Sequence, residues 1–134
     1  MSLAVARPRM KEIIETDAAP AAVGAYSQAT ATDDLVFTAG QIPLTPDGDL
    51  LDGAAIDVQT QQALENLQAV LEEAGASMDD VLKVTVFLED IDDFDAMNDT
   101  YAGFFEGAPP ARSAVGVDKL PKGVGVEIEA VATR

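Results

Sequence analysis

The sequence of 134 residues contains no cysteine and no histidine, and these two absences exclude several kinds of chemistry. Without cysteine there is no disulfide, thiol nucleophile, thiolate metal site or thiol redox switch. Without histidine, the common zinc sites and the Ser-His-Asp triad are excluded as well. Any proton transfer must therefore involve Asp, Glu, Tyr, Lys, water or the backbone.

Positive charge is also scarce, since 8 Lys and Arg residues accompany 24 Asp and Glu residues, for a net charge of −16. Nucleic acids and anionic membranes are bound by clustered Lys and Arg, which the body of the chain lacks, so we exclude both as partners. The acidity indicates either an ordinary solvated surface or a halophilic protein. In about 1 M salt the Debye length is roughly 3 Å, which screens repulsion between surface charges.

Long apolar runs are absent: no stretch of about 18 apolar residues is available to span a membrane, and no secretory signal is visible. We therefore expect a cytoplasmic protein. The length and a hydrophobic content of 48% fit one domain with its own core. Residues 1–9 precede a second methionine, Met10, and we interpret them as a tag or flexible N-terminal arm before a single domain at 10–134.

Two segments have apolar residues at the spacing of an amphipathic helix. The first covers residues 58–74, with Asp57 as the expected N-cap and Gly75 as the residue that stops the helix. The second covers residues 93–105, with Asp92 as the expected cap. These patterns predict two helices, each with one apolar face for packing.

Strand-like runs occupy residues 25–32, 35–39, 81–88, 112–117 and 124–132. Asp33 and Asp34 separate the first two runs and predict a hairpin. The run at 81–88 has apolar residues on both faces, so we expect it in the centre of a sheet. One of its faces is expected to hold Leu82, Val84, Val86 and Leu88. Two helices over a mostly antiparallel sheet make an α+β two-layer domain.

Arg112 is the strongest candidate for binding chemistry. It is the only arginine between Arg9 and Arg134, and it begins a strand shortly after Pro109 and Pro110, which we expect to end the second helix. An arginine fork binds a carboxylate through two parallel hydrogen bonds and keeps its charge at neutral pH. We interpret Arg112 as an anchor for a small anion, with a surface ion pair as the alternative.

Other candidates have equally simple alternatives. Glu127 and Glu129 point the same way in a strand, about 6.6 Å apart, and paired acids can divide acid and base roles or merely line a wet face. Asn98 lies on the apolar stripe of the second helix, where it is either a satisfied core amide or a ligand contact. Tyr26 either orients a ligand through its hydroxyl or packs near a turn.

Several segments, in order and at similar spacing, are similar to the motifs of one family. They are residues 20–28 (PAAVGAYSQ), 37–43 (FTAGQIP), 65–67 (ENL), 84–88 (VTVFL), 94–101 (FDAMNDTY), 110–113 (PARS), 120–122 (LPK) and 126–130 (VEIEA). Through them, residues 14–133 resemble the RidA family, also called the YjgF-like group.

The resemblance implies a chorismate-mutase-like, RidA-like fold and a homotrimer with active sites in the clefts between subunits. It implies hydrolytic deamination of reactive 2-imino or 2-enamino acids, such as 2-aminoacrylate and 2-iminopropanoate, to 2-keto acids and ammonia. The expected enzyme is a 2-iminobutanoate/2-iminopropanoate deaminase that uses no cofactor and no metal.

The resemblance also assigns roles to residues. Arg112 matches the arginine that binds the substrate carboxylate, and Glu127 matches the acid that positions or activates water. Tyr26 and Asn98 match residues that line the same cleft, and Gly40 matches a glycine whose backbone lies close to the ligand.

Two positions depart from a common family pattern, and other functions stay open. Ala39 replaces a frequent serine and Ala114 a frequent cysteine, so we expect these changes to affect substrate range and rate rather than reaction type. A non-catalytic ligand-binding or chaperone-like trimer is one alternative. A chorismate mutase would need more cations than Arg112 and a few lysines, and a nuclease disagrees with the net charge of −16.

Overall fold

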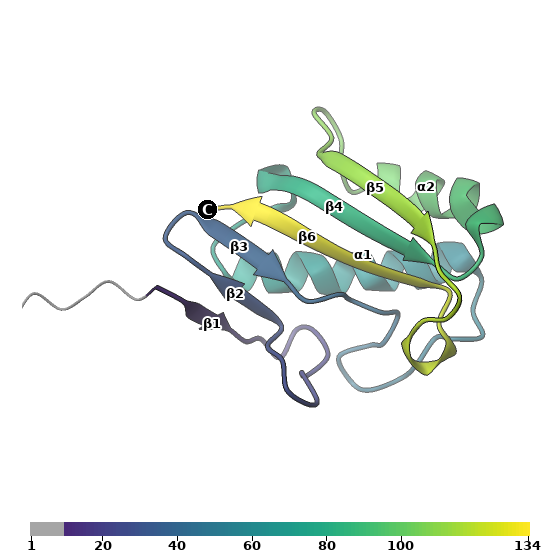
Figure 1. Ribbon diagram of the computed structural model, residues 1–134, viewed down its shortest axis with the longest axis horizontal. Coiled ribbons are helices and arrows are strands. Elements are labelled where there is room, and N and C mark those ends of the chain that lie inside the picture. The colour runs from purple at the N-terminus through teal and green to yellow at the C-terminus, as the bar shows by residue number, and fades with distance from the viewer. Residues whose placement is uncertain (1–9) are drawn as a thin grey trace, which may run out of the picture.

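Six strands form one sheet in the order β1-β2-β3-β6-β4-β5 in the computed structural model, which describes residues 10–134 (Figure 1). All neighbouring strands are antiparallel except β4 and β5, so the expected mostly antiparallel sheet is confirmed. The strands are β1 (Glu12–Ile14), β2 (Ala29–Ala31), β3 (Leu35–Thr38), β4 (Val81–Leu88), β5 (Ala111–Gly116) and β6 (Val126–Thr133). The expected N-terminal arm, residues 1–9, lies outside the described residues.

The strand predictions are correct in the centre of the sheet and less so at its edge. The hairpin around Asp33 and Asp34 is confirmed, because β2 and β3 pair antiparallel. Strand β4 is central, with a partner on each side. The run at 25–32 contains only the three-residue strand β2, and the short strand β1 has too weak an alternation to be predicted.

Both helices, α1 (Ile56–Glu73) and α2 (Phe94–Ala102), cover the same face of the sheet (Figure 1). The N-cap of α1 is Ala55, so the prediction of Asp57 was wrong; Asp57 lies in the first turn. The predicted stop is confirmed, since Gly75 has a φ of +85° and the Ala76 amide bonds the carbonyl of Leu71. This is the Schellman arrangement, which favours glycine.

Helix α2 is shorter than the sequence predicts. It begins at Phe94 and ends at Ala102, with Gly103 as its C-cap, well before the two prolines. Asp92 is not the cap either: the carboxylate of Asp90 accepts a hydrogen bond from the Asp92 amide at 2.9 Å and starts the 3-10 turn η2 (Ile91–Asp93). Residues 103–110 are consequently a connection that runs over the edge of the sheet to β5.

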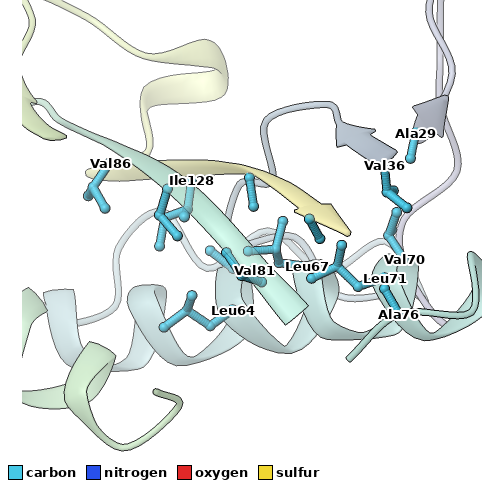
Figure 2. Close-up of a cluster of buried hydrophobic side chains, with 14 of the residues drawn as sticks. Ala29, Val36, Leu64, Leu67, Val70, Leu71, Ala76, Val81, Val86 and Ile128 are labelled. Carbon is cyan, nitrogen blue, oxygen red and sulfur yellow. The ribbon is translucent and has the colours of Figure 1, made fainter. Parts of the chain in front are cut away.

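The core lies between α1 and the central strands (Figure 2). Leu64, Leu67 and Leu71 of α1 are fully buried, as are Val86 of β4 and Ile128 of β6. Truncating one such leucine to alanine costs about 2–5 kcal/mol, because the lost contacts leave a cavity. Packing on this face therefore fixes which side chains of the central strands point to the helices and which point away.

One predicted core residue is not buried. A bulge in β4 between Val81 and Lys83 reverses the alternation, so that Val81 is buried and Leu82 is 51% exposed. An extra residue in one strand shifts every side chain before it to the other face. The prediction that Leu82 shares a face with Val84 was wrong for this reason.

Candidate active site

Arg112 lies on the edge strand β5 and points to the helix side of the sheet. It is in register with Val84, whose side chain is fully buried under the helices. Its Nη1 donates a hydrogen bond to the Asn98 side-chain oxygen at 2.7 Å. Its Cζ lies over two aromatic rings of α2, 4.6 Å from the centroid of Tyr101 and 5.3 Å from that of Phe94.

No carboxylate of residues 10–134 pairs with Arg112. Within residues 10–134 the single ion pair is that of Arg134 with Glu12, so the alternative of a surface ion pair does not explain Arg112. Asn98 is the polar residue on the apolar stripe of α2, and the guanidinium is its partner. Amide and rings hold the cation in place without neutralising its charge, which leaves it available to an anion.

A hollow of about 390 Å³ opens in front of the guanidinium, between α2 and the start of β5. This volume is within the usual range for sites of small molecules, about 300–1,000 Å³. Besides Asn98 and Arg112, the lining residues are Tyr101, Ala102, Phe105, Pro109 and Pro110. We call this space the Arg112 hollow.

Glu127 lies on the opposite face of the sheet, the face that α1 and α2 leave uncovered. We call this the open face; it carries Phe37, Lys83, Thr85, Phe87, Ser113, Val115, Glu127, Glu129 and Val131. Glu127 and Glu129 share it, as predicted from their spacing. Burial raises the pKa of Glu127, and the negative charge of Glu129 raises it further.

Gly40 lies directly against Glu127, where a side chain at position 40 would collide with the carboxylate. Only glycine permits so close an approach of backbone and carboxylate. The segment is fixed by Gln41, whose backbone exchanges two hydrogen bonds with Ile128, at 2.8 and 3.0 Å. The buried side chain of Asn66 also donates to the carbonyls of residues 42 and 44. Sequence reasoning assigned Asn66 no role of this kind.

Tyr26 is in a third place. Its side chain is 55% exposed and lines a separate hollow of about 460 Å³ near β1. The floor of that hollow is fixed by buried Gln28, which bonds the backbone of Thr16 and Pro20. Within the described chain the candidate residues therefore form three groups: Arg112 with Asn98, Glu127 with Gly40, and Tyr26 alone.

Among residues 10–134, no three acidic side chains are grouped so that they could hold a metal ion. In the same residues, neither helix combines the length and the apolar character that crossing a bilayer requires.

Comparisons with known proteins agree over nearly the whole chain. The sequence model of the family described as "Endoribonuclease L-PSP", to which the RidA and YjgF proteins belong, matches residues 16–134, and the chain belongs to this family. A RutC family protein of Pyrococcus horikoshii is 52% identical over 124 residues, 92% of this chain and 98% of the relative. The 2-iminobutanoate/2-iminopropanoate deaminase of Rattus norvegicus is 42% identical over 125 residues, 93% and 91% of the two chains.

Solved structures show the same fold. E. coli TdcF with bound serine has a TM-score of 0.87 at 43% identity, covering 92% of this chain and 98% of that one. Yeast Mmf1 has a TM-score of 0.89 at 38% identity with the same coverage. The predicted RidA-like two-layer α+β fold, with two helices on one face of a mostly antiparallel sheet, is thereby confirmed.

Proposed function

We propose that the protein is a deaminase that hydrolyses reactive 2-imino and 2-enamino acids to 2-keto acids and ammonia. The observation that carries this proposal is the placement of Arg112. It is a fixed cation without a counter-ion among residues 10–134, and it faces a hollow of small-molecule size. The name of the rat relative supports the reaction, and the serine bound by E. coli TdcF, also a small carboxylate, supports the class of ligand.

The proposed reaction needs a held substrate, a water and a carboxylate. Arg112 binds the substrate carboxylate and orients the imine, and orientation can supply much of the rate gain. Glu127 accepts a proton from water as the water oxygen attacks the imine carbon, and it passes this proton to the nitrogen to give a carbinolamine. It then takes the proton of the new hydroxyl and passes it to the same nitrogen, which leaves as ammonia. The carbon–nitrogen bond breaks and a ketone remains. Asn98, Gly40 and Tyr26 line the site.

We further propose a homotrimer whose sites lie in the clefts between subunits. In one subunit, Arg112 and Glu127 point to opposite faces of the sheet, so a small ligand bound at Arg112 needs the Glu127 of a neighbour. The open face also exposes apolar surface: Phe37 is 45% exposed and Val115 is 41% exposed. Exposed apolar residues that cluster on one sheet face favour burial against another subunit.

The reaction is tested by measuring ammonia while an L-amino acid oxidase generates imines from several amino acids. Faster ammonia release with this protein than in buffer supports the proposal. Release at the buffer rate with every imine would contradict it and favour the non-catalytic trimer. Sedimentation at micromolar concentration and high salt tests assembly, and a monomer there excludes the shared site.

The shared site makes a sharper prediction about mixtures. Arg112→Lys and Glu127→Gln, each inactive alone, should regain activity when they are dissociated and reassembled together. In random trimers about one quarter of the clefts combine an intact Arg112 with an intact Glu127, so recovery should approach one quarter of the wild-type activity. If the mixture stays as inactive as its components, both residues act within one subunit.

The activity in the family's description, endoribonuclease, is not favoured here. RNA binding requires basic surface, and this chain has 24 acidic against 8 basic residues.

A further inference from the structure

The hydroxyl of Tyr101 finds no hydrogen-bond acceptor within residues 10–134, although it is fully buried. Only 5% of the Tyr101 residue is exposed. Buried polar atoms in native proteins almost always have a partner, so an exception points to a group that is not part of the chain. The same tyrosine lines the Arg112 hollow, where a ligand could supply that group.

Neighbouring groups explain why the hydroxyl is unpaired. The ring is held between the Arg112 guanidinium, 4.6 Å from its centroid, and the Phe105 ring, at a centroid distance of 4.7 Å. A guanidinium has donors only, so it accepts nothing from the tyrosine. Among the residues that line the hollow, Asn98 has the one acceptor side chain, and its Oδ1 already accepts the 2.7 Å hydrogen bond from Arg112. A fixed ring therefore holds a donor that finds no acceptor.

The Arg112 hollow is lined by hydrogen-bond donors and apolar side chains, and by no acidic residue. Burial raises the pKa of Tyr101. The positive charge of Arg112 and its donation toward the phenol oxygen oppose this shift only in part, so the phenol keeps its proton at neutral pH. No acidic residue lines the hollow, and its other walls are the apolar side chains of Ala102, Phe105, Pro109 and Pro110. The hollow thus offers a guanidinium and a phenol as donors and apolar walls around them.

We infer that Tyr101 is a second substrate-binding group, whose hydroxyl donates a hydrogen bond to the carboxylate that Arg112 binds. The apolar walls accommodate a short aliphatic side chain on the same substrate. This inference rests on the proposed function for the identity of the substrate, but not for the binding of a carboxylate. Substrate binding supplies the acceptor that the folded chain lacks.

Tyr101→Phe tests the inference, because it removes the hydroxyl and keeps the ring. The probe is 2-oxobutanoate, a stable 2-keto acid, titrated by NMR into the assembled protein alongside its uncharged amide. A lost hydrogen bond to a charged group should weaken 2-oxobutanoate binding about 10- to 100-fold and raise KM for the imine similarly. The weak binding of the amide should change little. The melting temperature should not fall, since the hydroxyl has no partner in the unliganded chain.

Thr60→Val is the matched control. It removes another buried hydroxyl, but that hydroxyl already donates to the Ile56 carbonyl at 2.7 Å and lies on α1, away from the hollow. Binding of 2-oxobutanoate should be unchanged in this variant. Equal losses in both variants would indicate a general packing effect and overturn the inference.

The remaining outcomes separate this inference from the proposed function. If Tyr101→Phe binds the keto acid and hydrolyses imines like the wild type, the role of Tyr101 is wrong and the deaminase stands. If the wild type hydrolyses no imine but binds 2-oxobutanoate more tightly than Tyr101→Phe, the deaminase is wrong and the carboxylate-binding role of Tyr101 stands. If the wild type neither binds the keto acid nor hydrolyses imines, both are wrong.

Discussion

The two faces of the sheet hold charge in opposite ways. On the helix side, the cation of Arg112 rests on neutral groups: the Asn98 amide and two aromatic rings. On the open face, the carboxylate of Glu127 rests against Gly40 and beside another carboxylate, Glu129. Neither charge has a counter-ion within the described chain. Under the proposed function, the helix side supplies the group that binds the anion and the open face supplies the base.

Arg134 shows what an arginine with a structural role looks like. Its guanidinium donates to the carbonyls of Thr32 and Ala74, and its Nη2 pairs with Glu12 at 2.9 Å. These contacts join the C-terminus to the strand β1 and to the end of α1. Most N–H groups of the Arg134 guanidinium are hydrogen-bonded to other groups of the described chain, whereas the Arg112 guanidinium makes a single such hydrogen bond, to Asn98.

The largest effect should come from Glu127→Gln on the open face. Glutamine is nearly isosteric but takes no proton, so kcat should fall by about 10²- to 10⁴-fold, the usual contribution of a general acid–base group. Binding of 2-oxobutanoate should be little changed, because Arg112, and not Glu127, binds the carboxylate. The melting temperature should not fall, since the fold disfavours the ionised form. Steady-state kinetics and a thermal melt on one preparation check this, and unaltered turnover would move the role to Glu129.

On the helix side, Arg112→Lys keeps the charge but loses the planar fork. A loss of about 2–3 kcal/mol, typical of hydrogen bonds to charged groups, lowers kcat/KM roughly 30- to 150-fold. Arg134→Lys is the matched control: it should lower the melting temperature and leave kcat/KM unchanged. Near-wild-type imine hydrolysis in Arg112→Lys would mean that the active site lies elsewhere.

The pH dependence of kcat tests whether Glu127, on the open face, acts as the base. If Glu127 acts as a base, kcat falls as pH is lowered through its raised pKa. The acidic limb of the pH profile of kcat should therefore lie at a higher pH than the pKa of an ordinary glutamate. Glu129→Gln removes the neighbouring negative charge, lowers the pKa of Glu127 and should move the limb to lower pH. A limb in the same position in both proteins would show that another group titrates.

The smallest expected effect concerns the surface as a whole. Because 24 acidic residues repel one another on a small domain, the melting temperature should rise by a few degrees between about 0.1 M and 2 M potassium chloride. Both faces should respond alike, since the screening is not specific to a site. An unchanged or lower melting temperature at high salt counts against a halophilic protein.

Much of the architecture could be predicted from local patterns. The period of the apolar residues placed α1 and β4 within two residues of their observed bounds, and Gly75 marked a helix end because a left-handed residue favours glycine. The errors lie where local patterns compete with tertiary packing. Asp57 and Asp92 are both good caps in isolation, yet neither caps its helix, and Leu82 was misplaced by a bulge that no local signal marks.

The sequence by itself determined the available chemistry: without cysteine and histidine, and with few cations, Arg112 and the carboxylates were the groups left to consider. Only the tertiary structure decided how they are arranged. Register across β4 sends Arg112 and Glu127 to opposite faces. Packing of α2 on β5 gives Asn98 its partner and leaves the Tyr101 hydroxyl without one. These relations join residues far apart in the chain, and no local pattern encodes them.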